Sequence, residues 1–273
     1  MRLFSLKNKI ILITGASGLL GQEHAEAICK AKGVPVLLDL NQNDLDNQVR
    51  YLKKKYNILT KGYAVDITDE SQVKRNCKKI ILEFSKIDGL INNAANNPKF
   101  KNIDKKGFSR LESFDIESWD KDLSVSLTGS FLCSKHYGFQ ISKNPKGGSI
   151  INVSSDLGII APNQNLYKKE KLKEDEQPVK PVSYSVVKHG VIGLTKYIST
   201  YWAANNVRSN AICLGGVFNN QSKDFLDRVS NLIPLGRMAK KDEYHGLIIY
   251  LLSDSSSYIN GSIISADGGR TVW

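Results

Sequence analysis

Short apolar runs alternate with amphipathic stretches along the whole chain of 273 residues. Apolar runs of about four to eight residues predict buried strands, whereas apolar residues spaced three and four apart predict helices. The predicted strands cover residues 9–14, 34–39, 62–65, 89–92, 149–154, 207–214 and 262–266. The predicted helices cover residues 20–32, 44–56, 70–86, 118–140, 184–204 and 242–253.

Repeated strand–helix units indicate a parallel sheet with helices on both faces. We therefore expect an α/β fold, namely a Rossmann-type, doubly wound parallel sheet of about seven strands in a single domain over residues 1–273. No linker composition and no internal repeat divides the chain. Ligands of such sheets bind beyond the carboxyl ends of the strands, so the loops after the strands are where chemistry is expected.

Composition narrows the class of protein. Hydrophobic residues make up 41% of the chain, which is enough for a sizeable core. No apolar stretch approaches the roughly 20 residues of a membrane helix, and the first residues lack the apolar region of a signal peptide. The four cysteines lie far apart, without the spacing of metal ligands. We expect a cytoplasmic protein with free thiols, no metal and no membrane partner.

The net charge of +11 would suit a nucleic-acid ligand. The lysines are, however, scattered among acidic residues, and no recognition motif accompanies them. A basic enzyme with small anionic ligands is the simpler interpretation, so no nucleic-acid partner is expected.

A glycine-rich loop, Gly15 to Gly21, joins the first predicted strand to the first helix. Glycines there allow a tight turn and bring backbone N–H groups close to a pyrophosphate at the helix N-terminus. The position between a strand and a helix favours nucleotide binding over an ordinary turn. The residues expected to contact the dinucleotide here are Gly15, Ser17, Gly18, Leu19, Leu20 and Gly21.

Asp39 ends the second predicted strand, and its carboxylate can accept hydrogen bonds from the ribose hydroxyls of an adenosine. The same carboxylate would repel a 2′-phosphate, and no Arg or Lys follows it to bind one, so NAD is favoured over NADP. A solvated loop carboxylate is the alternative. Asp66, after the third strand, either approaches the adenine or caps the next helix. Leu40 and Ile67 accompany these two residues in the expected cofactor site.

Tyr184 and Lys188 lie four residues apart near the start of a predicted long helix, so their side chains share one face. A phenol ordinarily has a pKa near 10, and a neighbouring ammonium favours the phenolate and lowers that pKa. Tyr184 can then act as a general acid or base on a substrate oxygen. Ser155 ends the fifth predicted strand at the same edge, where its hydroxyl could hold that oxygen or simply cap a turn.

These motifs together resemble those of the short-chain dehydrogenase/reductase family, in the family's order and over nearly the whole chain. The resemblance rests on residues 14–21, 92–95, 152–155, 184–188 and 267–269. It implies that Tyr184 is the acid/base, that Lys188 modulates its pKa and binds ribose, and that Ser155 orients the substrate. It also implies a homodimer or homotetramer paired through the two long helices. The further cofactor contacts that it implies are Asn93, Ala94, Ala95, Gly215, Gly216 and Val217.

The chain departs from the family pattern in three places. The glycine spacing is typical of the family's extended branch, although length and later motifs fit the compact single-domain branch. Ser126 stands where an Asn usually anchors a proton-relay water, so we expect Ser126 to take that place while the relay itself is in doubt. Leu214 replaces a proline before Gly215, which predicts a looser nicotinamide loop.

Ser155 and Tyr184 lie farther apart than in compact members, which indicates a substrate-loop insertion around residues 159–182. A second loop, residues 97–113, leaves the fourth strand on the same side and is rich in lysine. Both loops favour a polar, anionic, sugar-derived substrate, although solvent-facing lysines are an equal alternative. The candidate substrate-loop residues are Asn97, Asn163, Gln164, Tyr167 and Asn219.

Residues 155–167, 214–221 and 267–273 are similar to bacterial family members of flagellin modification and of nonulosonic-acid or amino-sugar biosynthesis. This similarity implies oxidation of a sugar hydroxyl in a phosphorylated or carboxylated sugar. A 3-oxoacyl-carrier-protein reductase, which favours NADPH and an apolar crevice, is the alternative among enzymes. A sugar-nucleotide epimerase would need a larger substrate domain. A catalytically silent NAD-binding regulator, or an RNA-binding one, is the alternative from another class, and intact Ser155, Tyr184 and Lys188 argue against it.

Overall fold

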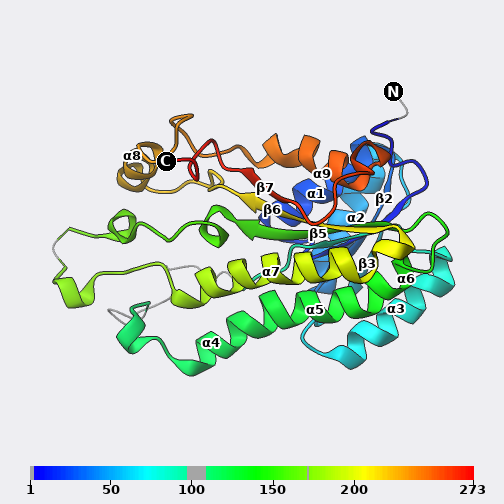
Figure 1. The fold of residues 1–273 in the computed structure, drawn as a ribbon, viewed down its shortest axis with the longest axis horizontal. Coiled ribbons are helices and arrows are strands. Elements are labelled where there is room, and N and C mark those ends of the chain that lie inside the picture. The colour runs from blue at the N-terminus through cyan, green and yellow to red at the C-terminus, as the bar shows by residue number, and fades with distance from the viewer. Residues whose placement is uncertain (1–2, 97–108, 171) are drawn as a thin grey trace.

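The computed structural model describes residues 3–96, 109–170 and 172–273, and these form a seven-stranded parallel sheet between layers of helices (Figure 1). The strands follow the order β3-β2-β1-β4-β5-β6-β7, so the order reverses between β1 and β4. This confirms the predicted doubly wound Rossmann-type sheet. The strands are β1 (Ile10–Thr14), β2 (Val34–Asp39), β3 (Lys61–Ala64), β4 (Gly89–Asn92), β5 (Gly148–Ser155), β6 (Val207–Leu214) and β7 (Ile263–Ala266).

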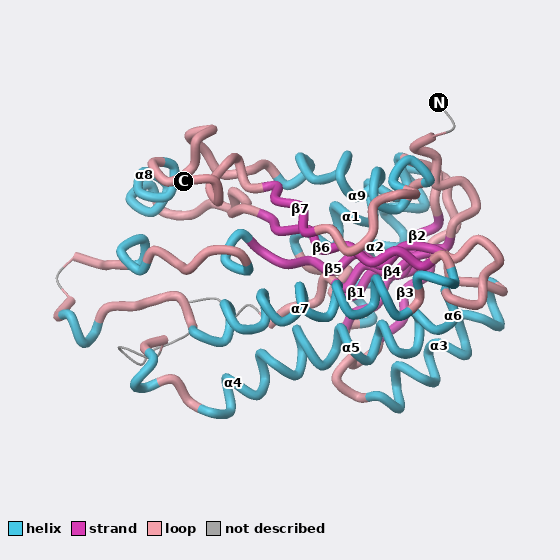
Figure 2. Tube along the Cα trace, viewed as in Figure 1, coloured by secondary structure: helices cyan, strands magenta, loops and turns pink. Residues whose placement is uncertain are grey.

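Helices cover both faces of the sheet (Figure 2). One layer holds α1 (Leu19–Lys30), α2 (Gln42–Tyr56) and α9 (His245–Leu252). The other holds α3 (Glu70–Phe84), α7 (Val182–Tyr201) and a long helical run that begins with α4 (Ile116–Leu123) and continues through α5 (Gly129–Cys133) to α6 (Phe139–Ile141). Several helices begin at a side-chain cap, as where the Asn41 side chain accepts hydrogen bonds from the first turn of α2.

Successive side chains of a strand point to opposite faces of the sheet. The hydrophobic core is therefore divided into two clusters, one under each layer of helices. Ile11 and Ile13 of β1 pack in the cluster under α1, α2 and α9, whereas Ile10 and Leu12 pack in the cluster under α3 and α7. All four side chains are buried because both faces of β1 are covered. The continuous apolar run read from the sequence therefore corresponds to a central strand.

Three helical predictions need correction. The helix predicted at 118–140 extends over 116–141 and contains two π-helical turns, Ser124–Thr128 and Ser134–Gly138. The helix predicted at 242–253 is a 3₁₀ turn, Lys241–Tyr244, followed by α9. Helix α8 (Lys223–Ser230) was not predicted, since it is only eight residues long and lies in a polar stretch. No helix in the described ranges is long and apolar enough to cross a bilayer.

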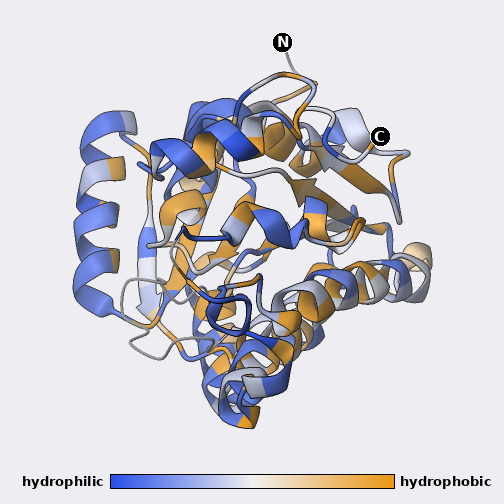
Figure 3. Cartoon of the chain, turned by 90° about the vertical axis from the view of Figure 1, so that its left-hand side faces the viewer, coloured by the Kyte–Doolittle hydropathy of each residue, from blue (hydrophilic) through white to orange (hydrophobic). Residues whose placement is uncertain are grey.

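The carboxyl ends of the strands point toward the insertion and α8, which extend beyond the sheet on the left of Figure 1. The 3₁₀ turn Gln164–Tyr167 of the insertion packs against α8, and a small apolar cluster lies between them. Tyr167 and Phe225 contribute a ring pair to this contact, with centroids 6.1 Å apart. Figure 3 looks onto this end, where segments of mixed polarity cross in front of the sheet. The insertion and α8 thus cover the edge where a ligand would bind.

Candidate active site

A continuous cleft crosses the carboxyl ends of the strands, from the glycine loop to the insertion and α8. Its volume is about 1420 Å³, which exceeds the roughly 300–1,000 Å³ of an ordinary small-molecule pocket. The cleft therefore has room for a dinucleotide and a second ligand side by side.

The glycine loop forms a cradle that side chains would fill. Gly15 has φ +63°, and a Cβ there would lie 2.8 Å from Ala94 Cα. A Cβ on Gly21 would lie 2.2 Å from the Gly15 carbonyl oxygen, so Gly21 permits α1 to start close to β1. The Ser17 hydroxyl is buried there and has no hydrogen-bond partner among the described residues. An unpaired hydroxyl at a helix N-terminus fits a phosphate oxygen, so this loop fits a dinucleotide.

Most of the predicted cofactor residues line the cleft. Gly21 acts through packing and does not line it. The Asn93 side chain donates to the carbonyl oxygens of Thr14 and Gly15, so it ties β4 to the glycine loop. The predicted cofactor residues that line the cleft are Gly15, Ser17, Gly18, Leu19, Leu20, Asp39, Leu40, Asp66, Ile67, Asn93, Ala94, Ala95, Tyr184, Lys188, Gly215, Gly216 and Val217.

The two ends of the cleft differ in charge. Asp39 accepts hydrogen bonds from the backbone N–H of Ser17 and of Leu40, each at 2.8 Å, which fixes its carboxylate beside the glycine loop. Asp44 and Asp66 line the same end. The cations among the described lining residues belong instead to the insertion, α7, α8 and the C-terminal segment. The end beside β2 therefore disfavours an additional phosphate.

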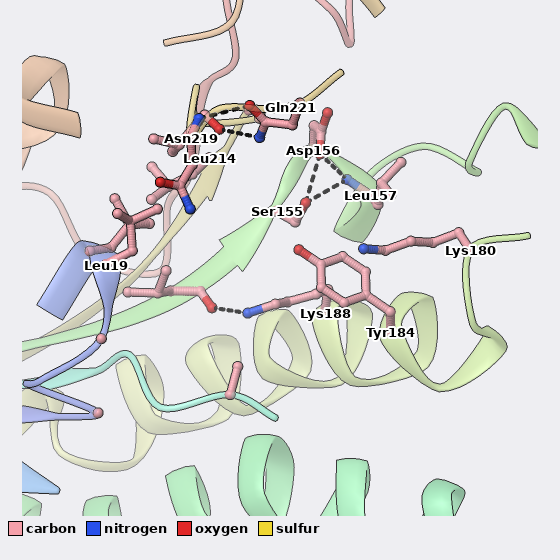
Figure 4. A pocket seen from close by; sticks show the side chains of 18 of the residues that line it. Leu19, Ser155, Asp156, Leu157, Lys180, Tyr184, Lys188, Leu214, Asn219 and Gln221 are labelled. Carbon is pink, nitrogen blue, oxygen red and sulfur yellow. Dashed lines mark hydrogen bonds between the residues drawn. The ribbon is translucent and has the colours of Figure 1, made fainter. Parts of the chain in front are cut away.

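Tyr184, Lys188 and Ser155 come together where α7 crosses the end of β5 (Figure 4). Ser154 Oγ donates to the Lys188 carbonyl oxygen at 2.7 Å, and Lys188 Nζ donates to the Val153 carbonyl oxygen at 2.9 Å. These bonds hold α7 against β5, and Tyr184, one turn earlier, directs its hydroxyl toward Ser155 (Figure 4). The three residues chosen from sequence thus share one site.

Burial controls the ionisation of this site. It raises the pKa of Tyr184, and a hydrogen bond with Ser155 opposes that shift. Burial also lowers the pKa of Lys188 to about 8. The Lys188 ammonium lies 5.8 Å from the centre of the Tyr184 ring. The expected lowering of the Tyr184 pKa is therefore not seen, because burial of the phenol is the largest cause of its shift.

A buried ion pair that sequence reasoning missed supports Ser155. Ser155 Oγ donates to Asp156 Oδ1 at 2.6 Å, and Arg270 Nη1 donates to Asp156 Oδ2 at 2.8 Å. Asp156 and Arg270 are both buried. Arg270 also lines the cleft, although 114 residues separate it from Asp156. No local signal in the sequence joins two residues so far apart.

The loop after β6 is held in place without the usual proline. The Gly215 N–H donates to the Ala266 carbonyl oxygen at 2.9 Å. The Tyr244 hydroxyl donates to the Gly215 carbonyl oxygen at 3.0 Å, and the Ala239 N–H donates to that of Gly216 at 3.0 Å. Leu214 therefore does not leave this loop loose, contrary to the expectation from sequence, because neighbouring segments supply its restraints.

The predicted substrate residues divide into two groups. Tyr167 and Asn219 line the cleft. Asn163 caps the 3₁₀ turn that follows it, and the Gln164 side chain accepts the Lys180 N–H, so these two act within the insertion. Asn97 lies outside the described residues, as does most of the loop 97–113.

Ser126 is buried within a π-helical turn and does not line the cleft, whereas its neighbour Val125 does. The place of the relay water is therefore still a prediction. Sequence reasoning did not single out Lys180, which lies in the cleft beside Tyr184 (Figure 4). Its charged surroundings in the sequence gave no means of distinguishing it from solvent-facing lysines.

Comparison with known proteins agrees with this site. Residues 9–169 match the family described as short chain dehydrogenase, and residues 176–271 match the one described as Enoyl-(Acyl carrier protein) reductase. The chain is 32% identical to a sorbose reductase of Candida albicans over 98% of this chain and 89% of the relative. It is 27% identical to the post-translational flagellin modification protein A of Campylobacter coli, over 97% and 98% of the two chains.

Among solved structures, a gluconate 5-dehydrogenase from Burkholderia cenocepacia, in complex with NADP and tartrate, has the same fold. The TM-score is 0.86 at 23% identity, and the match covers 100% of this chain and 98% of the other. The fold, the glycine cradle and the site formed by Ser155, Tyr184 and Lys188 all agree with the family match. The chain belongs to the short-chain dehydrogenase family of oxidoreductases.

Proposed function

We propose that this protein oxidises a hydroxyl group of a polar, anionic sugar derivative, with NAD as the hydride acceptor. The observation that carries this proposal is the Tyr184 hydroxyl, which faces Ser155 in a cleft whose described lining cations all lie at the end beside the insertion and α8, together with carboxylates such as Asp156. Similarity to a sorbose reductase supports a sugar-type substrate, and similarity to a flagellin modification protein supports a sugar used on a surface glycan.

The chemistry assigned to the chain's own residues is proton transfer. Tyr184, as phenolate, accepts the proton of the substrate hydroxyl, and Ser155 holds the substrate oxygen beside it. The Ser155 proton, which Asp156 accepts in this structure, can rotate toward that oxygen. Lys188, held by the Val153 carbonyl, keeps a positive charge near the phenol. When bound, oxidised nicotinamide supplies the hydride acceptor.

NAD is proposed over NADP because of the acidic end of the cleft. Asp39 is fixed beside the glycine loop by two backbone N–H groups, and Asp44 and Asp66 line the same end. A 2′-phosphate placed there would meet carboxylates, which repel it at short range. The ribose hydroxyls of NAD would instead find hydrogen-bond acceptors.

One observation favours a second candidate, reduction of an acyl chain. Apolar side chains from the insertion, from α8 and from the segment after α8 line part of the cleft, among them Leu166, Phe225 and Met238. A carrier-bound acyl group could pack against them. The acidic end of the cleft, which disfavours NADPH, argues for the sugar substrate.

Four buried free thiols support a reducing, cytoplasmic location for the enzyme. Burial raises the pKa of Cys29 to about 12 and that of Cys77 to about 11, which keeps both thiols protonated and unreactive. Cys133 and Cys213 are buried and free as well. A protein that keeps four unpaired thiols suits a compartment in which disulfides do not form.

The purified protein with NAD should form NADH with at least one member of a panel of amino-sugar phosphates, sugar nucleotides, nonulosonic acids and sugar acids. NADP is tested beside NAD, and an acetoacetyl thioester with NADH or NADPH tests the acyl alternative. Turnover of the thioester alone would establish the acyl reductase. Cofactor binding without any turnover would favour a silent regulator.

Tyr184→Phe should lower kcat/KM for oxidation by about 100-fold or more and leave the affinity for NAD in place, because only the proton acceptor is lost. The matched control is Tyr258→Phe, an exposed tyrosine outside the cleft. Since burial raises the Tyr184 pKa, the wild-type oxidation rate should rise as the pH increases above about 7, and the reverse reduction should fall, until Lys188, with its pKa of about 8, loses its charge. Activity retained in Tyr184→Phe would remove this residue from the mechanism.

Asp39→Ala should reduce the preference for NAD over NADP by about tenfold or more, because the carboxylate that repels a 2′-phosphate is gone. The measurement is the ratio of kcat/KM for the two cofactors. Asp46→Ala, which removes an exposed carboxylate from α2 outside the cleft, is the control and should keep the wild-type ratio. An unchanged ratio in Asp39→Ala contradicts the assignment.

We propose further that two or four chains assemble through the helical run 116–141 and α7, which leave large apolar side chains exposed. Phe131 is 49% exposed, Tyr197 64% and Tyr201 62%. Light scattering at micromolar concentration should give two or four times the chain mass, and Phe131→Asp should lower it. Leu59→Asp, at an exposed position between α2 and β3, is the control. A monomeric wild-type protein would reject this assembly.

A further inference from the structure

Lys180 carries an ammonium in the cleft that forms no salt bridge with any described carboxylate. Its Nζ lies 3.6 Å from the centre of the Tyr184 ring, and the side chain lines the cleft from the end of the insertion. Within the described ranges, its ammonium donates no hydrogen bond and makes no salt bridge, whereas Lys168 of the same insertion pairs with Glu174. The nearest aromatic contact of Lys180 is the proposed catalytic phenol itself.

The backbone around Lys180 is fixed before any ligand arrives. The Lys180 N–H donates to Gln164 Oε1 at 2.8 Å, and the Val179 N–H donates to Ser109 Oγ at 3.0 Å. Pro178 and Pro181 restrict the chain on both sides, and α7 begins directly afterwards at Val182. The insertion therefore fixes the backbone from which the Lys180 side chain enters the cleft.

Counting Lys180 itself, three cations and two carboxylates meet in this part of the cleft. Lys188 and Arg270 are the neighbouring cations, and Asp156 is the nearby carboxylate. Asp156 already accepts hydrogen bonds from Arg270 and from Ser155. Asp122, the other nearby carboxylate, accepts from Asn96 and from Ser183.

Burial lowers the pKa of Lys180 to about 8, which reflects the cost of a charge that lacks a partner. An anion beside the ammonium would remove that cost. Arg270 is already paired with Asp156, so the Lys180 ammonium is the one positive charge of the described residues here that is available to a ligand. This ammonium lies over the ring of Tyr184, whose hydroxyl would receive the substrate proton. This arrangement matches a singly charged group close to the reacting carbon better than a distant phosphate.

We propose that Lys180 binds a carboxylate of the substrate next to the hydroxyl that meets Tyr184, so that the substrate is a sugar acid. Figure 4 shows the Ser155 hydroxyl above the Tyr184 hydroxyl and the Lys180 ammonium to its right, beside the Tyr184 ring. This inference rests on the proposed oxidation of a polar hydroxyl and names its substrate class. Lys180 is the specificity-determining residue of that site, supplied by the insertion.

The test compares binding of sugar acids and of their neutral counterparts to the full-length enzyme with NADH present. The probes are threonate, xylonate and gluconate, each paired with the alditol of the same carbon chain. Dissociation constants come from calorimetry, so no turnover is needed. The variants are Lys180→Met, which keeps an unbranched side chain without charge, and Lys180→Arg, which keeps the charge. Lys173→Met, an exposed position of the same insertion outside the cleft, is the matched control.

The wild-type enzyme should bind at least one acid more tightly than its alditol. Lys180→Met should reduce that preference about ten- to a hundredfold, Lys180→Arg should retain most of it, and Lys173→Met should keep the wild-type value. NAD affinity and thermal stability of each variant show that the fold is intact. The inference is overturned if no acid is preferred by the wild type, or if Lys180→Met keeps the preference.

Failure of this inference can be told apart from failure of the proposed oxidation. If alditols or other neutral sugars are oxidised with NAD while the acid preference is absent, the oxidation stands and the role of Lys180 does not. If the acid preference depends on Lys180 while no substrate of the panel gives NADH, the carboxylate site stands and the oxidation does not.

Discussion

The attachment of α7 to the end of β5 is the constraint on which the catalytic site depends. Two hydrogen bonds run in opposite directions between them, one from Ser154 Oγ to the Lys188 carbonyl and one from Lys188 Nζ to the Val153 carbonyl. Both are buried, so neither partner can exchange its bond for water without cost. Because Lys188 is fixed in this way, Tyr184, one helical turn earlier, lies beside Ser155 at the end of β5. The three side chains of the proposed catalytic site are thereby brought together.

The buried Asp156–Arg270 pair connects this site to the C-terminal segment. A buried pair is costly to break from one side, because the remaining charge is left without a partner. Here the carboxylate also accepts the Ser155 hydroxyl, so the position of Ser155 depends on a residue that follows the last strand. The end of the chain therefore acts on the catalytic geometry, although it contributes no strand to the sheet.

The cleft joins an acidic end beside the glycine loop to an end that holds all of its described lining cations. Asp39 lies beside the glycine loop, whereas Lys180 lies over the Tyr184 ring. Oriented charges in a partly buried cleft act more strongly than the same charges in water. The overall charge of +11 is thus less informative than its distribution, because the lysine that matters for substrate binding is one among many in the sequence.

The sequence by itself determined the order of strands and helices, the glycine loop, Asp39 at a strand end and the Tyr184–Lys188 pair. These features depend on contacts within a few residues, which local spacing records. Tertiary structure alone decided that Arg270 reaches Asp156, that Lys180 lies against Tyr184 and that α8 covers the cleft. Such contacts join segments far apart in the chain, and their partners are chosen by how the insertion and the C-terminal segment pack over the sheet.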